Sequence, residues 1–117
     1  DGQGNERASL VYVLKEYIDI SELMDRIDKI SSDGYQYYQN HTVSFCDGSK
    51  IGWNDGKGVY SCLANRIYNT RNALIHSKSG KKNKMYKPYR DEMILQKEIP
   101  LVRVIAEMII INSSKVI

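Results

Sequence analysis

The sequence predicts an all-α fold, an up-and-down bundle of three or four helices that forms one domain. Three segments carry apolar residues at three- and four-residue steps, the spacing that lines one face of a helix. The connections between these segments are local in the sequence, which favours helices that pack beside their neighbours in the chain. The length of 117 residues suffices for one compact domain and is too small for two.

The first helical segment is the N-terminal third, about residues 5–31. Its apolar stripe consists of Leu10, Val13, Leu14, Tyr17, Ile20, Met24, Ile27 and Ile30. Asp19 and Glu22 fit a capping box, with Asp19 as the N-cap and Glu22 reaching back from the third helical position. The pattern therefore predicts either one long helix or two helices that meet near Asp19, and Ser31-Ser32-Asp33-Gly34 ends it.

The middle of the chain, about residues 34–57, is the least regular part. Glycines punctuate it, and Asp47-Gly48 and Asp55-Gly56 are turn dipeptides. Val43–Cys46 and Lys50–Trp53 could pair as a hairpin, and an irregular loop is equally compatible. We therefore expect a small irregular or hairpin insert around residues 43–53.

Aromatic side chains gather at the start of this segment. Tyr35, Tyr37 and Tyr38 could stack on nucleic-acid bases, although aromatic residues of a small helical domain more often cap the core. His41 has no evident partner in the sequence, and we interpret it as an ordinary surface histidine.

The third helix is predicted from about Gly58 to Ser77. A lysine-rich linker, about residues 77–89, follows it and contains the helix-breaking residues Gly80 and Pro88. The apolar stripe of the helix consists of Val59, Leu63, Ile67, Thr70 and Leu74.

The last helix is predicted over about residues 90–113, and Pro100 inside it predicts a kink or the first turn of a new helix. We expect two adjacent apolar lines of this helix to be buried. Two lines are more than one intramolecular face needs, so the surplus predicts a partner helix, for which a second copy of the chain is one source. One line consists of Leu95, Ile99, Val102, Ala106 and Ile109, and the other of Ile94, Leu101, Ile105 and Met108.

The formal net charge of +3 hides two segments of opposite sign. Residues 77–90 hold five lysines and one arginine without an acid, whereas the first 33 residues hold eight acids against four bases. Such a basic segment is either a solvated surface loop or a region that attracts polyanions such as nucleic acids.

The composition also argues against several classes of protein. No apolar run is long enough to cross a bilayer, and we expect neither membrane insertion nor a secretory signal. Cys46 and Cys62 lack the spacing of a zinc site, and we expect no metal or cofactor. A disulfide between them is geometrically possible, but we expect two free, buried thiols in a cytoplasmic protein. The chain begins at Asp1 without an initiator Met, and we expect it to be the C-terminal part of a longer protein.

One polar pattern can carry chemistry, the run Arg71-Asn72-Ala73-Leu74-Ile75-His76 at the end of the third helix. An arginine binds phosphate and a histidine exchanges a proton near neutral pH, so the two suffice for RNA cleavage without a metal. Arg71 and His76 lie roughly 140° apart around an ideal helix. Two antiparallel copies of the helix would therefore focus them on one atom more easily than a single helix does.

The run R-N-A-L-I-H resembles the R-x(4–6)-H signature of HEPN domains, the nucleotide-binding helical domains of higher eukaryotes and prokaryotes. A polar residue after the arginine, here Asn72, is typical of that family. The stretches Ser77–Ser79 and Glu98–Glu107 also look like those of HEPN domains in prokaryotic defence proteins. The resemblance covers about residues 58–113 and implies a four- or five-helix bundle that dimerises through the motif helices.

The resemblance further implies a metal-independent endoribonuclease, an effector or toxin module that cuts RNA at a composite site of a homodimer and leaves cyclic phosphate ends. Arg71 would polarise the phosphate, His76 would act as general acid or base, and Asn72 would orient one of them. Sensor or regulatory domains of the same protein are further expected partners. Lysines of the basic segment would attract the RNA backbone, namely Lys78, Lys81, Lys82 and Lys84.

Two other interpretations are compatible with the sequence. In the first, the chain is a non-catalytic HEPN-like module for dimerisation or partner binding, in which Arg71 pairs with an N-terminal acid and His76 caps its helix. In the second, the same arginine and lysine side chains sense a nucleotide.

Overall fold

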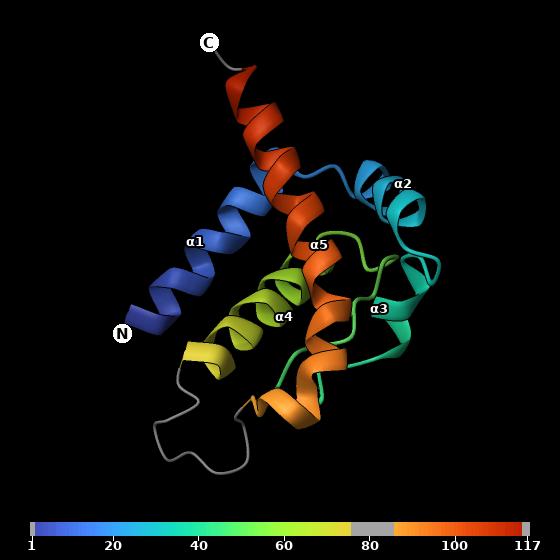
Figure 1. The fold of residues 1–117 in the computed structure, drawn as a ribbon. Helices are drawn as coiled ribbons and strands as arrows, with labels where there is room; N and C mark the ends of the chain where they lie inside the picture. Colours follow the sequence, from blue (N-terminus) through green and yellow to red (C-terminus); the bar gives the residue numbers. More distant parts are fainter. Residues whose placement is uncertain (1, 76–85, 116–117) are drawn as a thin grey trace.

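The computed structural model describes residues 2–75 and 86–115, and in this part of the chain the fold is all-α (Figure 1). The helices are α1 (Gly2–Tyr17), α2 (Ile20–Ile30), α3 (Gln36–Asn40), α4 (Gly58–Ile75) and α5 (Pro88–Ser114). α1 packs against α4 and α5, and α2 packs against α5. Figure 1 shows α1 and α4 side by side and running in opposite directions. The prediction of an all-α helical bundle is confirmed for these residues.

The N-terminal third forms two helices, with the break at Asp19. The carboxylate of Asp19 is the N-cap of α2 and accepts a hydrogen bond of 3.1 Å from the N–H of Ser21. The carboxylate of Glu22 instead accepts a hydrogen bond of 3.3 Å from Arg26, one turn further along α2. The two-helix alternative is thus confirmed, whereas the expected role of Glu22 in the cap is wrong because an arginine is within its reach.

The insert after α3 is irregular, since the described residues between α3 and α4 contain an isolated backbone bridge and no strand. Some of its backbone N–H groups donate hydrogen bonds to acceptors outside the insert. The N–H of Ile51 donates to the carbonyl of Tyr38 at 2.9 Å, and the N–H of Ser49 donates to the side-chain oxygen of Asn65 at 3.1 Å. These contacts with α3 and α4 take the place of a partner strand, and so the loop alternative is confirmed over the hairpin.

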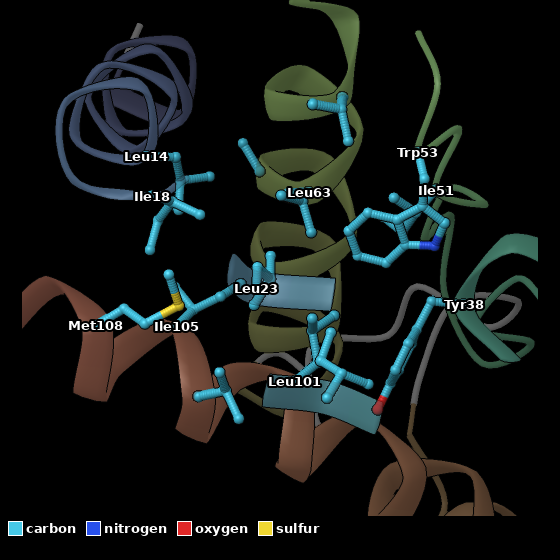
Figure 2. Packing of buried hydrophobic residues seen from close by; sticks show 14 residues of the cluster. Leu14, Ile18, Leu23, Tyr38, Ile51, Trp53, Leu63, Leu101, Ile105 and Met108 are labelled. Atoms are coloured by element: carbon cyan, nitrogen blue, oxygen red, sulfur yellow. The ribbon is translucent and has the colours of Figure 1, made fainter. Parts of the chain in front are cut away.

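The hydrophobic core lies where α1, α2, α4 and α5 meet, and Figure 2 shows side chains from these helices pointing into one interior. Side chains from α3 and the insert close one end of this core. The fully buried members include Leu14, Leu23, Ile27, Ile51, Leu63, Leu101 and Met108.

The tyrosines around α3 belong to this core and its edge. Tyr38 is buried, and Tyr35 packs edge-on against Trp53 with 6.1 Å between the ring centroids. The indole N–H of Trp53 also donates to the carbonyl of Tyr35 at 2.9 Å. The core-capping interpretation is therefore confirmed for all three tyrosines, since Tyr35 and Tyr37 are half-buried and pack against the core, and Tyr37 also stacks on His41.

Helix α5 buries one of its two apolar lines and exposes much of the other. Leu101 and Ile105 are buried as expected, but Ile99 and Val102 are 54% and 41% exposed. Within one copy of the chain, the surplus apolar line is therefore left largely exposed, and its burial against a partner helix stays a prediction. The physical reason is that Glu98 points inward to an ion pair with a buried arginine of α4, which fixes the rotation of α5 about its axis.

Pro100 lies inside the continuous helix α5, so the alternative in which it starts a new helix is wrong. A proline has no N–H and leaves the hydrogen-bond ladder of a helix incomplete. Beside this point, the hydroxyl of Tyr38 donates a hydrogen bond of 2.7 Å to the carbonyl of Lys97. Burial raises the pKa of Tyr38, which keeps the hydroxyl protonated as a donor. This bond attaches α3 to α5 next to the proline.

We expect Tyr38→Phe to lower the free energy of unfolding by about 1–2 kcal/mol, because it removes the partly buried hydrogen bond to the Lys97 carbonyl. Urea denaturation followed by circular dichroism measures this change. Tyr12→Phe is the matched control, since Tyr12 is 70% exposed, and it should stay within about 0.5 kcal/mol of the original chain. Equal stability of the two variants would contradict the role of the Tyr38 hydroxyl.

Candidate functional site

Helix α4 carries the predicted motif at its C-terminal end. The buried stripe of this helix follows the three- and four-residue spacing of Val59, Leu63, Arg66, Thr70 and Ala73. Two members of the predicted stripe differ, since Ile67 is only half-buried and Leu74 is exposed. Arg71 lies outside that stripe, and its side chain is 53% exposed. Ile75, the last residue of α4, is 56% exposed. The described part of the motif therefore lies at the surface, at the end of a helix that the core holds in place.

Arg71 makes two surface contacts. Its Nη1 donates to Oδ1 of Asn72 at 3.1 Å and lies 3.7 Å from a carboxylate oxygen of Glu6 in α1. The side chains of Arg71 and Glu6 are both more than half exposed, and ion pairs of this kind stabilise a fold by only about 0–1 kcal/mol. A phosphate oxygen can therefore replace Glu6 at the guanidinium with little loss of stability.

The structure places two of the three predicted catalytic residues. Arg71 and Asn72 lie together at the end of α4, joined by their hydrogen bond. His76 lies outside the described residues, directly after Ile75 in the sequence. The predicted RNA-binding lysines also lie outside the described residues, and they are Lys78, Lys81, Lys82 and Lys84. The prediction that these residues share a site with Arg71 stays a prediction.

An apolar groove of about 470 Å³ lies beside Arg71, between α4 and α5. Leu74 is 37% exposed in it, and the apolar line of α5 that is not fully buried forms the opposite wall. Arg103 also borders the groove, and its side chain is 74% exposed. The groove thus combines an apolar surface with two cationic side chains, and Thr70 and Glu98 also line it. Its apolar lining consists of Ile67 and Leu74 from α4 and of Leu95, Ile99 and Val102 from α5.

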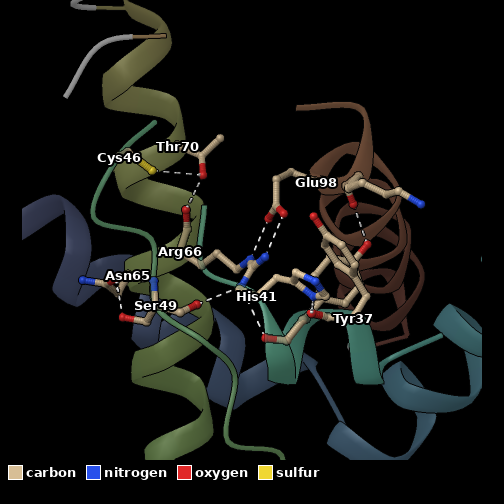
Figure 3. A network of polar contacts seen from close by, with 10 residues as sticks. Tyr37, His41, Cys46, Ser49, Asn65, Arg66, Thr70 and Glu98 are labelled. Atoms are coloured by element: carbon tan, nitrogen blue, oxygen red, sulfur yellow. Dashed lines mark hydrogen bonds and ion pairs between the residues drawn. The ribbon is translucent and has the colours of Figure 1, made fainter. Parts of the chain in front are cut away.

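A buried ion pair joins Arg66 of α4 and Glu98 of α5, and it is not among the features predicted from the sequence (Figure 3). Arg66 is fully buried, and its Nε and Nη2 donate to the two carboxylate oxygens of Glu98 at 2.6 and 2.8 Å. Its Nη1 donates to the carbonyls of Tyr38, His41 and Ser49 at 3.3, 2.6 and 2.9 Å. One guanidinium therefore connects α4 with α5, with α3 and with the insert.

The sequence does contain a signal for this pair. Arg66 follows Leu63 by three residues, so it occupies a position in the buried stripe of α4. Glu98 precedes Leu101 by three residues and lies on the buried face of α5 in the same way. A charge at a buried position needs a partner of opposite sign. Two such positions on different helices therefore predict an ion pair between them.

The remaining features of the described residues concern metals, thiols and membranes. No group of three or more His, Cys, Asp or Glu in this part of the chain could hold a metal ion. Cys46 is buried with its Sγ 3.8 Å from Oγ1 of Thr70, Cys62 is half-buried, and both thiols are free. Among the helices described, none is long and apolar enough to cross a membrane.

In comparisons with known proteins, no family model, no curated protein and no solved structure matches the chain.

We expect Arg66→Met to lower the free energy of unfolding by about 3–5 kcal/mol, because it leaves a buried carboxylate without its partner. Urea denaturation at neutral pH measures the loss. Arg103→Met is the matched control, since Arg103 forms an exposed ion pair of 3.8 Å with Glu107, and it should cost less than about 1 kcal/mol. A loss in Arg66→Met no larger than in this control would contradict the structural role of the pair.

The double variant Arg66→Met/Glu98→Leu separates the two functions of the guanidinium. It removes the unpaired carboxylate and should recover part of the lost stability. It should not recover all of it, because the carbonyls of His41 and Ser49 still lack their donor, whereas the carbonyl of Tyr38 keeps the N–H of Ile51. Full recovery would mean that the carbonyl contacts contribute nothing.

Proposed function

We propose that the chain is a HEPN-type, metal-independent endoribonuclease that cleaves RNA at a composite site between two copies, with Arg71 and His76 as the catalytic residues. The observation that carries this proposal is the exposed guanidinium of Arg71 on the border of an apolar groove. A histidine and a lysine-rich segment follow in the sequence. A phosphate-binding cation beside a surface suited to self-association is what a composite site requires.

In the proposed reaction, the 2′-hydroxyl of a ribose attacks the neighbouring phosphorus atom. One histidine accepts the proton of the 2′-hydroxyl, and the P–O5′ bond breaks as a second histidine protonates the leaving oxygen. Two copies of the chain supply these two histidines. The products are a 2′,3′-cyclic phosphate and a 5′-hydroxyl.

Arg71 binds the non-bridging phosphate oxygens and stabilises the charge that develops on them in the transition state. Asn72 already accepts a hydrogen bond from Arg71, and it orients the guanidinium toward the phosphate. The lysines between residues 78 and 84 attract the RNA backbone without regard to sequence, and this attraction weakens as salt is added.

The groove between α4 and α5 supports the homodimer. Ile99 and Val102 expose apolar surface on the helix that faces α4 across the groove. Covering such surface stabilises an interface by about 25 cal/mol for each Å² removed from water. A two-fold interface uses the same patch of both copies. Since Arg71 lines this patch, the dimer brings both Arg71 side chains to the interface.

We expect His76→Ala and Arg71→Ala each to lower the rate of RNA cleavage by about a hundredfold or more, because each removes a group that acts in the transition state. The assay is cleavage of a labelled single-stranded RNA in excess EDTA, in which the original chain should remain active. Loss of cleavage on adding EDTA, or full activity of a pure His76→Ala protein, would contradict the proposal.

Glu6→Gln is the matched control for Arg71→Ala. It removes the carboxylate beside Arg71 and leaves the guanidinium in place. We expect this variant to cleave RNA at least as fast as the original chain. If Arg71 serves only to pair with Glu6, the two variants should instead behave alike.

We expect Val102→Glu to convert the dimer into a monomer and to lower RNA cleavage in parallel, because it places a charge in the apolar groove. Sedimentation velocity gives the oligomeric state of the same samples that are assayed. Met93→Glu is the matched control, since Met93 lies on α5, is 72% exposed and does not line the groove. A monomeric original chain that cleaves RNA would contradict the composite site.

The second candidate function is a non-catalytic module for dimerisation or partner binding. The apolar lining of the groove and the contact between Arg71 and Glu6 favour it. This function predicts a stable dimer without RNA cleavage, and a dimer that survives Arg71→Ala and His76→Ala.

A further inference from the structure

The rings of Tyr37 and His41 form a stacked pair at the end of α3. The two residues are one helical turn apart, their ring centroids are separated by 4.4 Å, and their planes differ by 15°. Figure 3 shows them beside the ion pair of Arg66 and Glu98. His41 is exposed and Tyr37 is half-buried, so the imidazole is the ring of the pair that solvent reaches more freely.

Contacts on several sides fix this pair. Nδ1 of His41 donates to the carbonyl of Tyr37 at 2.9 Å, since a carbonyl oxygen can only accept. The carbonyl of His41 accepts a hydrogen bond of 2.6 Å from the buried Arg66. Nζ of Lys97 lies 5.6 Å from the centre of the Tyr37 ring. A flat ligand that stacks on His41 therefore meets an ordered surface, and its binding costs little conformational entropy of the protein.

A hollow of about 380 Å³ opens beside the stacked pair and is lined by polar side chains as well as the two rings. Gln36 and Asn40 stand four residues apart in α3, and each amide offers a donor and an acceptor. The carboxylate of Asp33 also lines the hollow, and the ammonium of Lys97 neutralises it at 2.5 Å. The hollow thus presents an aromatic face, amide groups and one carboxylate, whose charge Lys97 neutralises from outside its lining.

We propose that this hollow binds a nucleobase of single-stranded RNA, with adenine preferred. A nucleobase combines a flat face that stacks on an aromatic side chain with an edge of hydrogen-bond donors and acceptors. The amide of a glutamine or asparagine matches the adjacent donor and acceptor of adenine in two parallel hydrogen bonds. The base stacks on the His41 ring, and its edge reaches Gln36 or Asn40. The inference rests on the proposed function, because RNA is the source of the base.

The test is a titration of the isotope-labelled chain with adenosine, followed by nuclear magnetic resonance. Adenosine carries no phosphate, so the proposed phosphate site at Arg71 contributes nothing to its binding. We expect saturable shifts confined to the amides of residues 33–41 and the ring of His41. Ribose 5-phosphate should leave these signals unchanged, and uridine should bind more weakly than adenosine.

His41→Ala should weaken adenosine binding by roughly tenfold or more, which is the usual effect of removing a stacking side chain. His41→Phe should retain binding, because it keeps an aromatic face. Gln39→Ala is the matched control, since Gln39 is an exposed residue of the same helix that does not line the hollow. A purely structural role of His41 would make His41→Phe as damaging as His41→Ala.

The base site is overturned if adenosine gives no saturable shift at residues 33–41, or if His41→Ala binds it as well as the original chain. Equal binding of uridine overturns the preference for adenine. The outcome is independent of the cleavage assay. Adenosine binding without RNA cleavage would overturn the nuclease and keep the base site, whereas cleavage without adenosine binding would do the reverse.

Discussion

The arrangement of the fold around the candidate site depends on the buried ion pair between Arg66 and Glu98. A guanidinium has its N–H donors in a rigid plane, and here Nε and Nη2 donate to the two carboxylate oxygens, while the two N–H groups of Nη1 are shared among three backbone carbonyls. The carbonyls belong to α3 and the insert, which contain little regular structure of their own. A lysine in the same place has no planar fork and could not reach all five acceptors. The pair therefore gives an irregular segment the fixed position that a strand would gain from its neighbours.

The same pair determines which faces of α4 and α5 are left at the surface. With Arg66 inward, the three- and four-residue steps of α4 bury Leu63 and Thr70 and turn Arg71 outward. With Glu98 inward, α5 buries Leu101 and leaves its next apolar line beside α4. The groove and the exposed position of Arg71 on its border thus both follow from the inward orientation of this ion pair.

Much of the helical fold can be predicted from the sequence, because apolar periodicity and capping residues such as Asp19 act over a few positions. For α5 the sequence does not decide which of the two apolar lines is buried, since the composition of both is compatible with burial. The choice between them depends on Glu98, and hence on an arginine 32 residues earlier in the chain. The insert is unpredictable for the same reason, because its partners are side chains and carbonyls of other elements. At the candidate site, the motif predicts Arg71 and Asn72, whereas the stacking of Tyr37 on His41 requires knowing that α3 forms a helix there.

The two surfaces proposed to bind RNA are connected through the ion pair of Arg66 and Glu98. Arg71 lies five residues after Arg66 on a helix without a proline or glycine between them, so the rise of the helix fixes their separation. His41 is attached to Arg66 through its own carbonyl at 2.6 Å. Arg71 and His41 therefore belong to one rigid unit, and a strand of RNA bound at both proposed sites would meet them at a fixed spacing. The apolar groove lies on α4 and α5 beside Arg71, so a second copy docked there would add its own arginine without moving either surface.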